Sequence, residues 1–173
     1  MRSAETRRLF FALWPDSAIR AGIEDRRQRL AAPSRRSVPT HNLHATLVFL
    51  GDQPAERLPA IEAAGDRAGR DCGVFELLLD RFGWFARARV VWLGAESVED
   101  GQALVSRLRH FLAEDGIETE TRAWTPHVTL FRNVQARPEF LDPEPLAWSV
   151  DSFALIESIP NRPYQVLRSW PLQ

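Results

Sequence analysis

Residues 41–51 read His41-Asn42-Leu43-His44-Ala45-Thr46-Leu47-Val48-Phe49-Leu50-Gly51. They begin with polar side chains, continue as an apolar run that holds one histidine and one threonine, and stop at a glycine. This pattern predicts a short buried strand that starts from a polar segment. Because side chains alternate between the two faces of a strand, His44 and Thr46 are expected to share one face. The opposite, structural face is expected to hold Ala45, Leu47 and Phe49.

The core of this stretch, His-x-Thr-Leu, returns at His127-Val128-Thr129-Leu130. The chain has four histidines, so two such patterns among them indicate a two-histidine site built from two related halves. Two unrelated core strands that each carry a histidine are the alternative. We expect the other histidines outside the site, His41 in a loop and His110 late in a helix, where a cation suits the helix dipole.

Length and composition fit one soluble domain of two lobes that spans residues 1–173. The net charge is −1, so no overall basic field is present to hold long nucleic acid, and phosphate recognition has to be local. All 22 basic residues are arginine, so any cationic phosphate contact would be planar and capable of two parallel hydrogen bonds.

The chain has a single cysteine, Cys72, which excludes an internal disulfide and a thiolate metal cluster. This usage is typical of a reducing cytosol, and we expect a cytoplasmic protein. The first residues faintly resemble a signal peptide, but the apolar part, Leu9 to Trp14, is too short and no small-residue cleavage site follows. No apolar run is long enough to span a bilayer.

Apolar periodicity predicts about three helices and six to eight strands. The helices are expected at residues 17–30, 52–70 and 97–116, the first capped by Asp16 and the third by a capping box at Ser97. Outside the two motifs, strands are expected at residues 8–14, 75–81, 89–93, 117–122, 150–157 and 164–167. Residues 75–81 and 89–93 would pair as an antiparallel hairpin. The order fits an α+β fold whose antiparallel sheets and outer helices form two pseudo-symmetric lobes around a central cleft.

Two His-x-Thr strands that face each other across a cleft offer a particular chemistry. A neutral imidazole can take a proton from water, and a protonated one can give a proton to a leaving oxygen. The threonine hydroxyls can bind the non-bridging oxygens of a phosphate. Such a device suits a strained cyclic phosphate and needs no metal. Metal binding is the competing interpretation, but His41 and His44 are three residues apart on an extended segment and would point to opposite faces.

With its two His-x-Thr motifs the chain resembles the 2H phosphoesterases, and within them the bacterial and archaeal RNA 2′,3′-cyclic phosphodiesterases, historically called 2′-5′ RNA ligases. Residues 44–51 match the first motif of that family and residues 126–132 match the second. Residues 8–13 and 153–158 look like its opening strand and closing segment. The resemblance implies a two-lobed α+β fold and hydrolysis of RNA or nucleoside 2′,3′-cyclic phosphate to a 2′-phosphomonoester, with no cofactor or metal.

By the same resemblance, His44 would be the proton donor to the departing 3′-oxygen and His127 the proton acceptor from water. Thr46 and Thr129 would hold the phosphate. Arg132 matches a common family arginine, although strict alternation turns it away from the site unless a bulge re-aims it. Because the two motifs are nearly symmetric, the residues alone leave open which histidine is the acid.

Three alternative functions remain at this stage. The chain could be a 2′,5′-phosphodiesterase, an RNA 2′-5′ ligase, or a non-catalytic module that binds nucleotides or RNA ends. The expected partners are RNA 3′ ends or nucleotides that carry a 2′,3′-cyclic phosphate. No membrane partner is expected, and we expect a monomer.

Overall fold

The computed structural model of the chain describes residues 5–173. Residues 1–4, which begin the segment compared with a signal peptide, lie outside the described part. The described chain is an α+β protein, as predicted, with three helices, α1 (Ser17–Gln28), α2 (Leu58–Gly69) and α3 (Glu99–Glu114). None of these helices is both long and apolar enough to cross a membrane.

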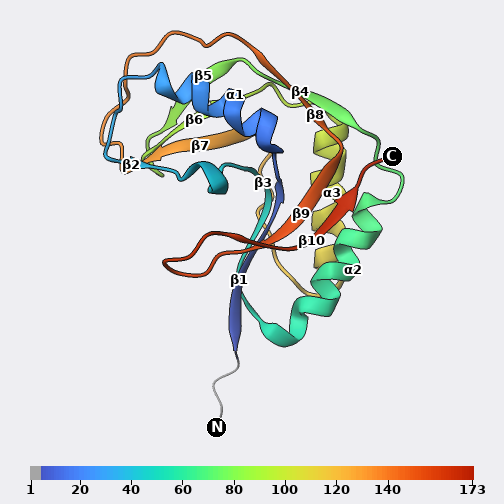
Figure 1. The fold of residues 1–173 in the computed structure, drawn as a ribbon. Helices are drawn as coiled ribbons and strands as arrows, with labels where there is room; N and C mark the ends of the chain where they lie inside the picture. The colour runs from blue at the N-terminus through green and yellow to red at the C-terminus, as the bar shows by residue number, and fades with distance from the viewer. Residues whose placement is uncertain (1–4) are drawn as a thin grey trace.

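Most of the strands belong to one antiparallel sheet, in which the strands do not follow the order of the chain (Figure 1). Its order is β10-β9-β1-β3-β7-β6-β5, and β2 pairs with β7 outside this path. These strands are β1 (Thr6–Leu13), β2 (Arg36–Ser37), β3 (Ala45–Pro54), β5 (Arg81–Phe85), β6 (Val90–Gly94), β7 (His127–Arg132), β9 (Ser152–Glu157) and β10 (Gln165–Pro171). A separate two-stranded sheet pairs β4 (Phe75–Leu79) with β8 (Leu146–Val150).

The large sheet consists of two half-sheets that meet at one point. Strands β3 and β7, which carry the two motifs, share a single registered pair, Ala45 with Val128. In contrast, β3 pairs with β1 along its whole length, and β7 pairs with β6 over four positions. Figure 1 shows the half-sheet of β1, β3, β9 and β10 diverging from the half-sheet of β5, β6 and β7 at this junction. The divergence leaves room for a site between them.

The core lies where the helices cover the sheet. Strand β1 buries five consecutive residues, Leu9 to Leu13, as expected for a central strand that is covered on both faces. Helices α2 and α3 lie side by side (Figure 1), with α2 against β10 and α3 against β3. Gly65 of α2 allows this approach, because a Cβ at this position would lie 2.5 Å from the ring of Trp170. The two His-x-Thr motifs are thus carried by strands that are fixed in a tightly packed core.

Helix and strand ends differ in part from the sequence predictions. Asp16 caps α1 as predicted, since its carboxylate accepts the Ile19 N–H at 2.8 Å. The prediction of a capping box at Ser97 is wrong, because α3 has no side-chain cap. The Ser97 hydroxyl instead accepts a hydrogen bond from the Gln102 side chain. Helix α2 begins later than predicted because β3 continues past Gly51, whose positive φ of 69° lets the strand bend and keep pairing with β1 as far as Pro54.

The predicted hairpin between residues 75–81 and 89–93 is also wrong. The chain turns at Asp80, whose N–H donates to Gly94 O, and the hairpin partner of β6 is β5. Strand β4 instead pairs with β8 and buries alternate residues on one face. Residues 117–122 form no strand; they are an irregular segment that leads toward β7.

Candidate active site

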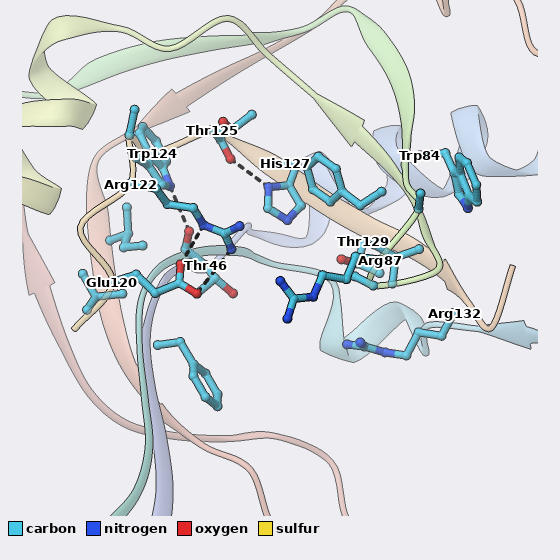
Figure 2. A pocket seen from close by; sticks show the side chains of 18 of the residues that line it. Thr46, Trp84, Arg87, Glu120, Arg122, Trp124, Thr125, His127, Thr129 and Arg132 are labelled. Carbon is cyan, nitrogen blue, oxygen red and sulfur yellow. Dashed lines mark hydrogen bonds and ion pairs between the residues drawn. The ribbon is translucent and has the colours of Figure 1, made fainter. Parts of the chain in front are cut away.

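A cleft of about 1080 Å³ lies beside the junction of the two half-sheets. Thr46 and Phe49 of β3 line one side, and His127, Thr129 and Arg132 of β7 line the other. The hairpin of β5 and β6 and the irregular segment before β7 complete the walls. Figure 2 shows that side chains from both motifs converge on this space.

His127 points into the cleft with one nitrogen already committed to the backbone (Figure 2). Its Nδ1 lies 2.7 Å from the Thr125 carbonyl oxygen, which assigns the proton to Nδ1 in the neutral ring. Nε2 then carries a lone pair and has no hydrogen-bond partner among residues 5–173. The edge of the Phe85 ring meets the imidazole at a centroid distance of 5.0 Å, and Trp92 lies at 6.1 Å. The geometry leaves Nε2 ready to accept a proton.

His44 is held in the same way from the other strand. Its Nδ1 lies 2.7 Å from the carbonyl oxygen of Asn42, two residues earlier in the chain. Thr125, which holds His127, also lies two residues before its histidine. Its Nε2 lies 3.1 Å from the Thr46 hydroxyl, which confirms that His44 and Thr46 share a face. His44 does not itself line the cleft; it borders it through Thr46.

Aromatic rings enclose the His44 imidazole. The centroids of Phe10, Tyr164 and Trp14 lie 4.9, 5.5 and 6.1 Å away. The Tyr164 N–H donates to the Asn42 side chain at 3.0 Å, so the segment before the first motif is tied to the start of β10. This enclosure holds the ring in one orientation and removes water from its faces.

The two motifs are joined by more than the single strand pair. The Trp124 indole N–H, which lies just before the second motif, donates to the Thr46 carbonyl oxygen at 2.9 Å (Figure 2). In the antiparallel register set by Ala45 and Val128, each histidine stands opposite the threonine of the other motif. The junction is therefore close to a local two-fold axis with one His-Thr pair on either side.

A bulge follows each motif and changes the predicted faces. Strand β3 carries Leu47 as an extra residue opposite β1, and β7 carries Leu130 as an extra residue opposite β6. The bulge in β7 turns Arg132 to the cleft-lining face of the strand, which His127 and Thr129 also occupy, whereas strict alternation would have turned it away. The bulge in β3 has the same effect on Phe49. The prediction that Phe49 lies on the structural face is thus wrong: its side chain is 47% exposed and lines the cleft.

Burial and nearby cations lower the pKa of both histidines. Desolvation lowers the pKa of His44 from 6.5 to about 4, the Asn42 carbonyl partly opposes this, and the charges of Arg132, His127 and Arg20 lower it further. Desolvation also lowers the pKa of His127, with a smaller contribution from Arg122. Both shifts favour the neutral form of the ring. A bound phosphate anion would raise both pKa values, because it favours the charged ring and offsets the arginines.

Three arginines of the cleft wall, Arg87, Arg109 and Arg122, were not predicted from the sequence. Arg122 is paired with Glu120 at 2.8 Å, the one acidic side chain among the lining residues, whereas Arg87 extends into the cleft from the β5–β6 turn (Figure 2). Arg109 lies in α3, whereas Arg87 sits on a turn and Arg122 on the irregular segment, where no periodicity marks a face. Their only signal in the sequence is that every cation is an arginine.

The remaining histidines lie outside the site. His41 is in a short 3-10 helix, Thr40–Asn42, and is exposed. His110 lies late in α3, with Nε2 3.5 Å from the Glu114 carboxylate. Within the described residues, no group of three histidine, cysteine or acidic side chains is arranged to hold a metal ion.

Comparisons with known proteins agree on one family. Residues 14–161 match the sequence model of the 2′-5′ RNA ligase superfamily. The RNA 2′,3′-cyclic phosphodiesterase of Escherichia coli (strain K12) is 36% identical over 176 residues, which cover 98% of each chain. The enzyme of the same name from Thermus thermophilus is 32% identical over 96% of this chain and 90% of its own. The crystal structure of E. coli LigT complexed with 3′-AMP superposes with a TM-score of 0.85, at 34% identity over 97% of this chain and 99% of that one.

Proposed function

This chain belongs to the 2′-5′ RNA ligase superfamily, and from that premise we propose that it hydrolyses RNA 2′,3′-cyclic phosphate to a 2′-phosphomonoester with His44 and His127 as the proton-transfer pair. The observation that carries the proposal is the junction of β3 and β7, where Thr46, His127 and Thr129 line one cleft and His44 lies directly behind Thr46. Relatives that cover almost the whole chain bear the name of this activity.

In the proposed reaction, the phosphate lies between the two histidines. A water molecule attacks phosphorus while Nε2 of His127 takes its proton; the bond from phosphorus to O3′ breaks, and O3′ takes a proton from Nε2 of His44. His127 suits the base because its Nε2 has a free lone pair that faces the cleft. His44 suits the acid once phosphate binds, because the bound anion raises its pKa and favours the charged ring, which can then give its proton to O3′.

Thr46, Thr129 and Arg132 are proposed to bind the phosphate. The hydroxyls can donate to its non-bridging oxygens, and the guanidinium can neutralise the charge that grows on them as the bond to phosphorus forms. Thr46 has a second task, because its hydroxyl also contacts Nε2 of His44 at 3.1 Å and can hold the acid in line with the leaving oxygen. In this proposed arrangement, protein side chains alone hold the phosphate.

The natural substrates are proposed to be RNA 3′ ends and nucleotides that carry a 2′,3′-cyclic phosphate. The arginine-lined cleft fits a short anionic chain. We further propose a monomer that works in the cytoplasm, where the buried thiol of Cys72 would stay reduced.

The direct test is incubation of the native chain with adenosine 2′,3′-cyclic phosphate in excess EDTA, followed by chromatographic separation of the 2′- and 3′-monophosphates. The proposal expects turnover with 2′-AMP as the main product. Activity that disappears in EDTA and returns with a divalent metal would contradict the metal-free mechanism. Tight binding of 2′-AMP without turnover of any cyclic phosphate would instead identify a nucleotide-binding module.

A further inference from the structure

We propose that a basic surface, which starts in the cleft and continues outside it over the shared end of β2, β7 and β6, binds the phosphates of an RNA strand that precede its terminal nucleotide. This inference rests on the hydrolysis proposed above and names the substrate more closely, as an RNA strand of several nucleotides rather than a cyclic mononucleotide. The surface, called the basic end of the sheet, consists of six exposed arginines. They are Arg35, Arg36, Arg87, Arg89, Arg132 and Arg137.

Positive and negative charges are segregated along the chain. Residues 30–40, 82–95 and 123–138 contain these six arginines and no aspartate or glutamate. The other sixteen arginines share the rest of the chain with all 23 acidic residues. The net charge of −1 is therefore the balance between a positive region and a negative remainder, and the positive region can attract a polyanion although the whole molecule is nearly neutral.

The fold brings the three segments together at one end of the sheet. Strand β2 lies beside the end of β7 (Figure 1), and Arg36 stands directly opposite Arg132 in this pair. The Ser34 hydroxyl donates to the Arg132 carbonyl oxygen at 2.6 Å and fastens the same contact. On the other edge of β7, the Val134 N–H donates to the Arg89 carbonyl oxygen at 2.9 Å. Arginines that are far apart in the sequence therefore share one surface.

The pairing of Arg36 with Arg132 has an electrostatic cost. Residues directly opposite each other in an antiparallel pair point to the same face, with Cα atoms about 4.5–5.5 Å apart, and like charges in this position repel. Among residues 5–173, no carboxylate forms an ion pair with any of the six arginines. A phosphate bound between the two guanidinium groups would replace this repulsion with charge-assisted hydrogen bonds to both of them.

The basic end of the sheet is continuous with the site of the proposed reaction. Arg87 and Arg132 line the cleft (Figure 2), and Arg36 shares the face of Arg132 but lies outside the cleft lining. An RNA strand whose terminal phosphate is bound in the cleft can therefore leave it over Arg36 and its neighbours. Contacts to phosphates carry no sequence information, so we expect this surface to accept any base.

The first measurement uses the native chain and two substrates, uridine 2′,3′-cyclic phosphate and an oligouridylate of about eight nucleotides that ends in the same group. In about 50 mM NaCl we expect KM for the oligonucleotide to be at least about tenfold lower, because its additional phosphates release counterions when they bind arginine. The advantage should disappear near 0.5 M NaCl, where such contacts are screened. Equal KM values for the two substrates at low salt would contradict the inference.

The second measurement removes part of the surface and leaves the cleft lining intact. For Arg35→Gln/Arg36→Gln we expect KM for the oligonucleotide to rise roughly tenfold, the slope of log KM against log salt to fall by about 1.4, and the kinetics on the mononucleotide to stay native. Urea denaturation should show no loss of stability, because the repulsion from Arg132 is removed. Arg57→Gln/Arg70→Gln is the matched control: it removes the same charge from two exposed arginines outside the three segments and should behave like the native chain.

Direct binding separates this inference from the proposed hydrolysis. Fluorescence anisotropy measures the Kd of the same oligouridylate with a terminal 2′-phosphate in place of the cyclic group, and we expect Kd to rise roughly tenfold in Arg35→Gln/Arg36→Gln and to stay native in Arg57→Gln/Arg70→Gln. If both double variants change Kd equally, or neither does, the inference is wrong, and the hydrolysis stands as long as the cyclic mononucleotide is turned over. If the native chain turns over no cyclic phosphate, the proposed function fails, and the anisotropy result alone decides whether this surface binds RNA.

Discussion

The two histidines should lose activity as a unit rather than as independent groups. Each is held by one backbone carbonyl through Nδ1; Nε2 of His127 has no hydrogen-bond partner among residues 5–173, and Nε2 of His44 contacts only the Thr46 hydroxyl there. We expect His44→Ala and His127→Ala each to reduce the single-turnover rate on a cyclic nucleotide by roughly 10²–10⁴, and the double variant to be little slower than either. Losses that multiply in the double variant would show that the two groups do not act in the same step.

The low pKa of His44 has a consequence for stability. In the unfolded chain His44 takes up a proton near pH 6.5, whereas in the folded chain it does so only near pH 4. Between these values the unfolded state binds more protons, so stability is full above pH 6.5 and falls as the pH falls toward 4. We expect His44 to cost about 2 kcal/mol of unfolding free energy between pH 7.5 and pH 5, as measured by urea denaturation.

His44→Gln supplies the control for this effect. His127 has a lowered pKa as well and contributes in the same direction, so the native chain loses stability from both rings. The carboxylates with lowered pKa, Glu24, Asp80 and Glu157, contribute only below their ordinary range near pH 4. The variant should therefore lose clearly less stability than the native chain over this interval; equal losses would mean that His44 titrates normally.

Alternation in the sequence was sufficient to bring His44 and Thr46 to one face, and likewise His127 and Thr129. It failed five residues after each histidine, at Phe49 and at Arg132. A bulge adds one residue to a strand without any glycine or proline to mark it, so the chain after Leu47 and Leu130 changes face with no local signal. Only the register with neighbouring strands, set by contacts far apart in the sequence, reveals the change.

At the scale of elements, the β5–β6 hairpin depends on the absence of a side chain at Gly83. A Cβ there would lie 2.0 Å from the Trp92 ring, which in turn packs beside Phe85 and His127. We expect Gly83→Ala to lower the unfolding free energy by about 1–3 kcal/mol, because Trp92 has to move, and to lower the turnover rate, because Trp92 borders the His127 ring. Denaturation and kinetics on the same preparation measure both effects.

Gly73→Ala is the matched control for Gly83. Its nearest neighbour is a backbone oxygen of Gln173 at 3.7 Å, an ordinary contact, and its φ is not in the left-handed region. We expect a change within about 0.5 kcal/mol and native activity. A similar loss in both variants would indicate a general effect of removing glycine from this chain rather than a clash with Trp92.

Element prediction succeeded where the apolar pattern was long and failed where pairing decided the outcome. Strand β1 and helix α1 lie close to their predicted bounds because five buried residues and a capping aspartate define them locally. The partner of β4 could not be read from sequence, since β8 lies about 70 residues further along the chain and β6 was the nearer candidate. Residues 117–122 have strand-like composition but no neighbouring strand with which to pair.

At the scale of the whole molecule, the net charge is small, but positive charge is concentrated in the cleft. The net charge is −1, yet four arginines line the cleft and its single acidic lining residue, Glu120, is paired with Arg122. We expect KM for a trinucleotide ending in a 2′,3′-cyclic phosphate to rise more steeply with NaCl than KM for the cyclic mononucleotide. Removal of one phosphate contact by Arg87→Ala should reduce the slope of log KM against log salt for the trinucleotide by about 0.7.

Arg57→Ala is the control for this salt effect, since Arg57 is exposed and lies outside the cleft. It should leave both slopes unchanged. If Arg87→Ala and Arg57→Ala have the same small effect on the trinucleotide, the cleft does not hold the RNA beyond its terminal nucleotide.

The position of β1 in the sheet also bears on how the protein is made. This strand lies between β3 and β9, and Leu9 pairs with Glu157 while Arg7 donates two hydrogen bonds to the Glu157 carboxylate. At about 5–20 residues per second, a ribosome delivers β9 roughly 7–30 s after β1. During that interval the edge of β1 that will pair with β9 has no partner strand. The nascent chain is therefore a candidate for chaperone binding, and a truncated product that ends before β9 is expected to aggregate rather than fold.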